Sequence, residues 1–70
     1  MHHIITVENG KYPIILEQYE RPTQRFKVTY GLQIKRNLDY AAAAKEFGFC
    51  YFHMLACEGR FDHWSYDGNE

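Results

Sequence analysis

Two cysteines and two of the histidines in this 70-residue chain have side chains that could bind a metal. Cys50, His53 and Cys57 are three and four positions apart, and these spacings place side chains on one side of a helix. His63 could approach from the segment that follows, and thiolate and imidazole groups together are typical zinc ligands. Zinc sites usually hold a cysteine pair on a turn, however, and not three ligands along one helix. We therefore interpret both cysteines as small apolar side chains, and we predict no metal and no cofactor.

The same region carries groups that could act as a nucleophile or as an acid–base pair. Cys57 with Glu58 and His63, or Asp62 with His63, are the two sets that can be drawn. Adjacency in sequence does not establish catalytic geometry, and the chain has no glycine-rich phosphate loop, nucleophile elbow or paired-carboxylate spacing. A chain of this length also has little room for a closed pocket. We predict that the protein is not an enzyme.

One long helix, predicted over residues 38–59, must position these side chains. Its four consecutive alanines, residues 41–44, favour helix because alanine loses no side-chain entropy there. Asp39 can cap the first turn, with Asn37 as the other candidate. Gly59 suits the left-handed position that follows the last turn.

The second half of the predicted helix is apolar on almost its whole circumference, which is unusual for a surface helix. Lys45, Glu46 and His53 lie on the side that we predict to face solvent, together with Phe49, Phe52 and Ala56. The side that we assign to a sheet contains Tyr40, Ala43, Ala44, Phe47, Cys50, Tyr51 and Met54.

Three strands are predicted before the helix. Residues 4–8 and 11–19 flank Asn9-Gly10, which is a strong signal for a tight hairpin. Residues 25–35 alternate between apolar and polar side chains, which predicts one half-buried antiparallel strand. On this strand Phe26, Val28, Tyr30, Leu32 and Ile34 would share the face beneath the helix.

The expected fold is therefore α+β, with a three-stranded antiparallel meander packed on one long C-terminal helix (β-β-β-α) and followed by an aromatic tail. We expect residues 1–66 to form a single domain and residues 67–70 to be frayed. The formal net charge of −1 argues against a general binder of phosphate backbones. No signal peptide or membrane-spanning segment is recognisable, so we expect a cytoplasmic location and no membrane partner.

Two surfaces could bind a partner. The outer face of the predicted sheet carries Arg25, Lys27, Lys35 and Arg36 near Tyr19, and basic residues beside an aromatic ring can bind single-stranded nucleic acid. Glu8 and Glu17 on the same face weaken that interpretation. An ordinary solvated face with Glu–Lys pairs is the alternative that we favour there.

The other surface is aromatic. Phe61, Trp64 and Tyr66 of the tail either fold back over Phe49 and Phe52 or form with them an exposed patch. Exposed apolar patches of a few hundred Å² mark docking sites. We predict a protein-binding surface formed by Phe49, Phe52, His53, Ala56, Trp64 and Tyr66, with a homodimer through the same helix as a variant.

In overall design the chain resembles the small single-domain accessory proteins of bacteriophages and prophages, including anti-CRISPR-type inhibitors. The resemblance lies in the Asn9-Gly10 hairpin, the alternating strand and the helix with its alanine run and its Ala56-Cys57-Glu58-Gly59 ending. It implies an inhibitor or adaptor that binds a host or defence protein without catalysis, in the host cytoplasm. It does not imply a particular target.

Overall fold

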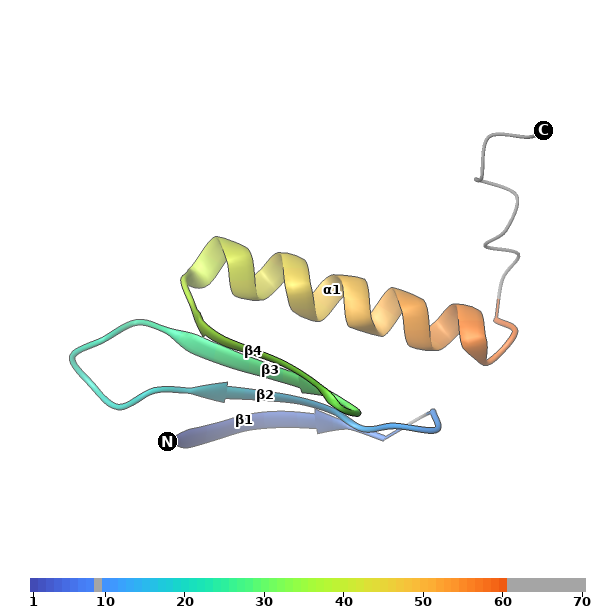
Figure 1. Ribbon diagram of the computed structural model, residues 1–70, viewed down its shortest axis with the longest axis horizontal. Helices are drawn as coiled ribbons and strands as arrows, with labels where there is room; N and C mark the ends of the chain where they lie inside the picture. Colours follow the sequence, from blue (N-terminus) through green and yellow to red (C-terminus); the bar gives the residue numbers. More distant parts are fainter. Residues whose placement is uncertain (9, 61–70) are drawn as a thin grey trace.

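The computed structural model describes residues 1–8 and 10–60, which form one antiparallel sheet and one helix (Figure 1). Within these residues the elements are β1 (His2–Val7), β2 (Ile14–Gln18), β3 (Phe26–Tyr30), β4 (Gln33–Leu38) and α1 (Tyr40–Cys57). The strands lie side by side in sequence order, and α1 packs on one face of the sheet. The α+β architecture is confirmed, but the expected number of three strands is wrong. The predictions for residues 61–66 and 67–70 lie outside the described residues.

The additional strand arises at Gly31-Leu32, where the predicted third strand reverses direction. Tyr30 pairs with Gln33 across this two-residue connection. Gly31 has a φ of 61°, and a positive φ at the first central position, preferably on glycine, is what a type II′ hairpin turn requires. Leu32 is fully exposed at the tip, with a relative accessibility of 101%, so its predicted place beneath the helix is wrong.

This turn also reverses the predicted faces of the residues that follow it. Directly paired residues in an antiparallel sheet point to the same side. Lys35 pairs with the buried Val28 and therefore lies on the helix-covered face, whereas Ile34 pairs with Thr29 on the open face. Both assignments are the opposite of what an unbroken alternation predicts.

The connection between β1 and β2 is longer than a tight hairpin. Val7 pairs with Ile14, so residues 8–13 form the loop, and Asn9 within it lies outside the described residues. Gly10 packs closely on the helix, because a Cβ there would lie 2.6 Å from Cγ of Met54. The hairpin pairing is confirmed, but the two-residue turn at Asn9-Gly10 is wrong.

The core is a narrow line of contact between α1 and the middle of the sheet. Ile14 and Val28 from the strands meet Cys50 and Met54 from the helix, and all four have a relative accessibility of 1% or less. Ala43 is also buried and allows a close approach at the start of the helix. Tyr40, Ala44 and Tyr51 were expected in this interface but are exposed.

The residues at the two ends of α1 are those that the sequence predicted to cap it. The side chain of Asp39 accepts a hydrogen bond from the backbone N–H of Ala42 at 2.8 Å, which confirms it as the N-cap. Gly59 has a φ of 76° and donates its N–H to the carbonyl of Ala56, so it has the left-handed conformation expected after the last turn. The helix is shorter than the predicted residues 38–59 because Leu38 completes β4.

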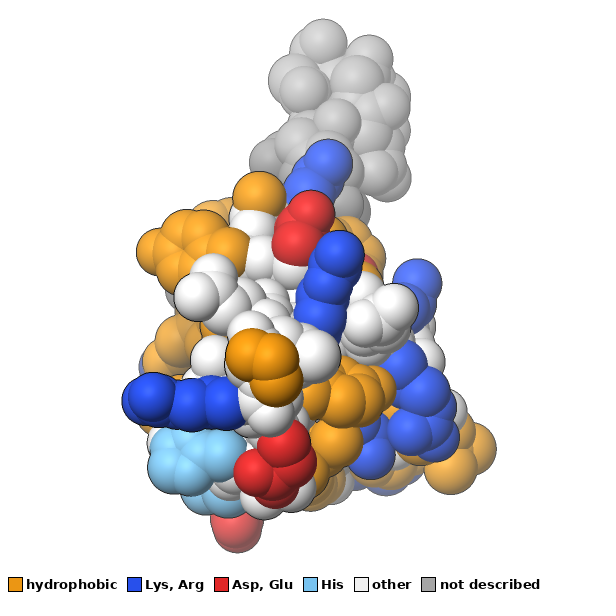
Figure 2. Space-filling view, turned by 90° about the vertical axis from the view of Figure 1, so that its left-hand side faces the viewer, with side chains coloured by type: hydrophobic (Ala, Val, Ile, Leu, Met, Phe, Trp, Pro, Cys, Tyr) orange, Lys and Arg blue, Asp and Glu red, His pale blue; other side chains and the backbone are white. Residues whose placement is uncertain are grey.

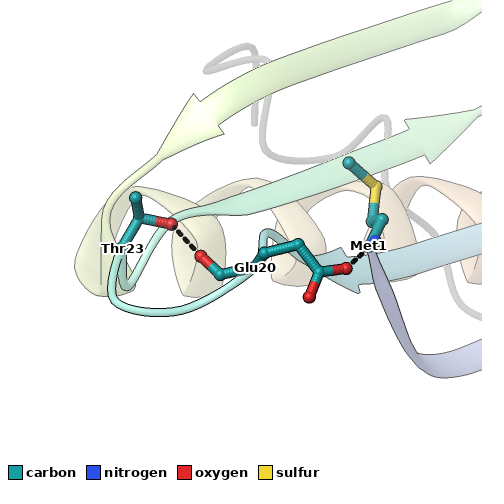
Figure 3. Close-up of polar contacts among 3 residues, drawn as sticks. All are labelled: Met1, Glu20 and Thr23. Atoms are coloured by element: carbon teal, nitrogen blue, oxygen red, sulfur yellow. Dashed lines mark hydrogen bonds and ion pairs between the residues drawn. The ribbon is translucent and has the colours of Figure 1, made fainter.

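Polar contacts secure the loop between β2 and β3 (Figure 3). Thr23 Oγ1 donates a hydrogen bond to the carbonyl of Glu20 at 2.8 Å. The Glu20 carboxylate pairs with the N-terminal ammonium of Met1, and this hydrogen bond and charge lower the pKa of Glu20. The peptide bond between Arg21 and Pro22 is cis.

Glycine substitutions test the turn at Gly31. We expect Gly31→Ala to lower the free energy of unfolding by about 1–2 kcal/mol, because an L-residue is strained at positive φ and the new Cβ would lie 3.2 Å from Tyr12 Cγ. Gly48→Ala is the matched control. Apart from its own helix backbone, no atom of residues 1–8 and 10–60 lies within 4 Å of its added Cβ, so this helical substitution should stabilise by roughly 0.5–1 kcal/mol. Urea unfolding measures both, and equal stability of Gly31→Ala and the wild type would contradict the turn.

Candidate functional site

Two phenylalanines on the outer side of α1 form the centre of the candidate site. Phe49 and Phe52 have relative accessibilities of 60% and 66%. With 3.6 residues per turn, their side chains point away from the line of buried residues that contacts the sheet. The ring of His53 stacks on Phe49 at a centroid distance of 6.2 Å. Together with the half-buried Ala56, these residues form the outer helix surface that the sequence predicted.

His53 also connects this surface to the sheet. Its Nδ1 lies 3.1 Å from the hydroxyl of Tyr30 on β3, and the two rings meet edge to face at 5.8 Å. The sequence placed His53 on the side of the helix away from the sheet; it lies at the edge of that outer surface, where its ring also reaches β3. Burial, assisted by the nearby thiols of Cys57 and Cys50 and by Glu58, raises the pKa of Tyr30. The Tyr30 hydroxyl therefore stays protonated beside His53.

The two cysteines have different surroundings. Cys50 is fully buried and its thiol lies 3.7 Å from the carboxylate of Glu46, which itself accepts a hydrogen bond from Gln33 Nε2. Burial, and then the negative charge of Glu46, raises the pKa of Cys50 to about 11. Cys57 is exposed, with its sulfur 3.7 Å from His53 Nδ1. Glu46 was expected on the solvent side, but its bond to β4 shows that it lies at the edge of the sheet-facing side.

Residues 1–8 and 10–60 contain no group of three or more side chains that could hold a metal ion. Cys57 and His53 are close to each other, while Cys50 contacts Glu46 instead. His63, the fourth ligand considered from the sequence, lies outside the described residues. The same holds for Asp62 and for the aromatic residues Phe61, Trp64 and Tyr66.

The basic residues considered for nucleic-acid binding are divided between the two faces of the sheet. Lys27 Nζ lies 4.0 Å from Glu17 Oε1 on the open face, as expected for a cross-strand pair. Lys35 lies on the helix-covered face, so the predicted strip of Arg25, Lys27, Lys35 and Arg36 on one outer face is wrong. A shift in strand register between Phe26 and Val28 interrupts regular pairing beside Arg36.

A groove that the sequence did not predict runs beside the first half of α1. Its walls are entirely apolar and enclose about 140 Å³; they are formed by Leu16, Phe26, Tyr40, Ala43, Ala44 and Phe47. The signal was present in Ala44, whose small exposed side chain leaves space between the helix and β2.

The groove leads to a wider hollow at the end of the molecule where α1 begins. This hollow encloses about 570 Å³ and is lined by the loop between β2 and β3, Phe26 and Tyr40. Arg21 borders it, and Arg25 borders an adjoining hollow beside Tyr40. Figure 2 views this end and shows Lys and Arg side chains on both sides of the hydrophobic ones.

Comparison with known proteins finds no matching family model, no matching curated protein and no matching solved structure. Within the described ranges, α1 does not reach the length and apolarity that a membrane-spanning helix needs.

The cysteines should react very differently with a thiol reagent. At pH 8 the native protein should be alkylated rapidly at Cys57 and only very slowly at Cys50, because the thiolate is the reactive form and Cys50 is buried with a pKa of about 11. Mass spectrometry of iodoacetamide-treated protein measures this. In urea both should react, and Cys57→Ser should leave the native protein nearly inert. Rapid native labelling of Cys50 would contradict its burial.

Proposed function

We propose that this protein is a small non-catalytic protein-binding module that contacts its partner through the outer helix surface of Phe49, Phe52, His53 and Ala56. The observation that carries the proposal is the exposure of two neighbouring phenylalanine rings, 60% and 66%, on one helix. Aromatic side chains bring large apolar area to an interface and are enriched in its buried core. A few bulky side chains clustered near the centre of an interface typically provide most of the binding free energy.

The shape of this surface favours a macromolecular partner over a small ligand. Phe49 and Phe52 project from a convex helix, whereas small molecules are bound in concave pockets. The helix is capped at Asp39, and the hydrogen bond between His53 and Tyr30 links its outer surface to β3. Because the surface is already ordered, less conformational entropy is lost when a partner binds.

The resemblance to small phage and prophage proteins supports the class of partner in this proposal. A short α+β domain with exposed aromatic rings is suited to binding a host or defence protein stoichiometrically, as an inhibitor or adaptor. Such a protein acts by occupying a surface of its partner, which requires neither a catalytic group nor a cofactor. We propose the host cytoplasm as its location.

Nucleic-acid binding through Arg25, Lys27, Lys35 and Arg36 stays a prediction with less support, because Lys35 lies on the face opposite to Lys27. The two functions respond differently to salt. Binding to a phosphate backbone weakens by orders of magnitude over a few-fold rise in salt. Docking of aromatic rings should change little over the same range.

Serine substitutions test the outer helix surface. A pull-down from host lysate with mass spectrometry identifies the partner, and calorimetry then measures its affinity for the variants. Phe49→Ser and Phe52→Ser should each weaken binding about tenfold or more, since truncating a hot-spot aromatic typically costs on the order of 2 kcal/mol. Tyr40→Ser is the matched control, because this ring is 78% exposed but lies at the groove, away from the outer surface.

Unchanged affinity of both phenylalanine variants, with circular dichroism showing an intact fold, would remove the basis of the proposal. Sedimentation at two protein concentrations distinguishes a homodimer through the same surface. In that case the wild type should associate as concentration rises, and Phe52→Ser should remain monomeric.

A further inference from the structure

Beside the apolar groove, the helix-covered face of the sheet continues to β1, where an apolar side chain remains exposed. Ile5 on β1 pairs with Leu16 on β2, so both side chains belong to the helix-covered face. The backbone of the helix approaches β2, β3 and β4 but not β1, although Val7 of β1 packs against the buried cluster. Ile5 consequently keeps a relative accessibility of 44%. An exposed isoleucine on β1 thus lies next to Leu16, which forms one wall of the groove.

The end of this groove is positively charged. Arg21 and Arg25 border the hollow beside Tyr40, and neither guanidinium has a carboxylate partner within residues 1–8 and 10–60. The two carboxylates at this end have other roles. Glu20 pairs with the N-terminal ammonium, and Asp39 caps the helix.

The sequence after Arg60 has the complementary chemistry. Residues 61–70 contain three aromatic residues, three acidic residues and no lysine or arginine. The acids are Asp62, Asp67 and Glu70. Such a segment combines rings suited to an apolar groove with negative charge suited to its arginine-bordered end.

The length of this segment also matches the distance. From Cys57 back to Ala44, α1 rises about 20 Å along its axis, at 1.5 Å per residue. Six extended residues after Arg60 span roughly the same distance at about 3.3 Å each. Tyr66 can therefore reach the walls of the groove, and the remaining residues can reach Arg21 and Arg25.

We propose that residues 61–70 of the same chain dock in this groove, running antiparallel to α1. Trp64 and Tyr66 contact Leu16, Ala44 and Phe47, and the acidic residues near the C-terminus lie beside Arg21 and Arg25. This assigns Trp64 and Tyr66 a place different from the protein-binding surface predicted from the sequence. The function proposed for Phe49 and Phe52 does not depend on it, because those rings lie on another side of the helix.

Trp64 is the single tryptophan of the chain and reports its own environment through fluorescence. In the full-length wild type we expect strong protection of Trp64 from acrylamide quenching relative to the urea-unfolded protein. Ala44→Glu should raise the quenching constant severalfold, because it adds a carboxylate to an apolar wall that faces an acidic segment. Lys45→Glu is the control. It changes the charge more, but it lies outside the groove and should leave quenching unchanged.

Ala44 is exposed and glutamate is a good helix former, so Ala44→Glu should keep the fold; circular dichroism checks this. Arg25→Glu provides an independent variant and should also increase quenching, with an effect that shrinks at high salt. Three results would overturn the proposal. They are an unprotected Trp64 in the wild type, protection that is lost on dilution and so comes from a second copy, and loss of protection in Phe49→Ser but not in Ala44→Glu.

Discussion

A single helix about 10–12 Å wide packs here on a sheet whose strands are about 4.8 Å apart, and this difference in width determines most other features of the protein. The helix can cover little more than two strand spacings, so its backbone does not approach that of β1, although Val7 still packs against the core. Burial is concentrated in one line, from Ala43 through Cys50 to Met54. The apolar groove beside β2 and the exposed Ile5 both follow from the same limit.

The sequence allowed prediction of those features that depend on a single residue or a short pattern. Asp39 as the N-cap and the left-handed Gly59 belong to this class. Gly31 was the critical exception. An isolated glycine within an alternating run signals either a bulge or a turn, and the alternation on both sides concealed the reversal. A prediction without this reversal necessarily places Ile34 and Lys35 on the wrong faces of the sheet.

The candidate site was predictable in part for a similar reason. A helix with apolar side chains all around must expose some of them when only one layer lies beneath it, and Phe49 and Phe52 are two of these. The groove was not predictable, because the helical wheel gives directions but no distances. Tyr40 and Ala44 point toward the β2 side of the helix, yet the sheet there lies too far away to bury them.

The turn at Gly31-Leu32 limits which insertions and deletions this fold can accept between β3 and β4. Because strand faces alternate with a period of two, adding or removing one residue between β3 and β4 while a two-residue turn is retained would exchange the two sides of β4. Ile34 would then lie beneath the helix, and Lys35 would move into water. As long as the turn keeps two residues, the number of residues between β3 and β4 therefore determines which side chains of β4 face the helix.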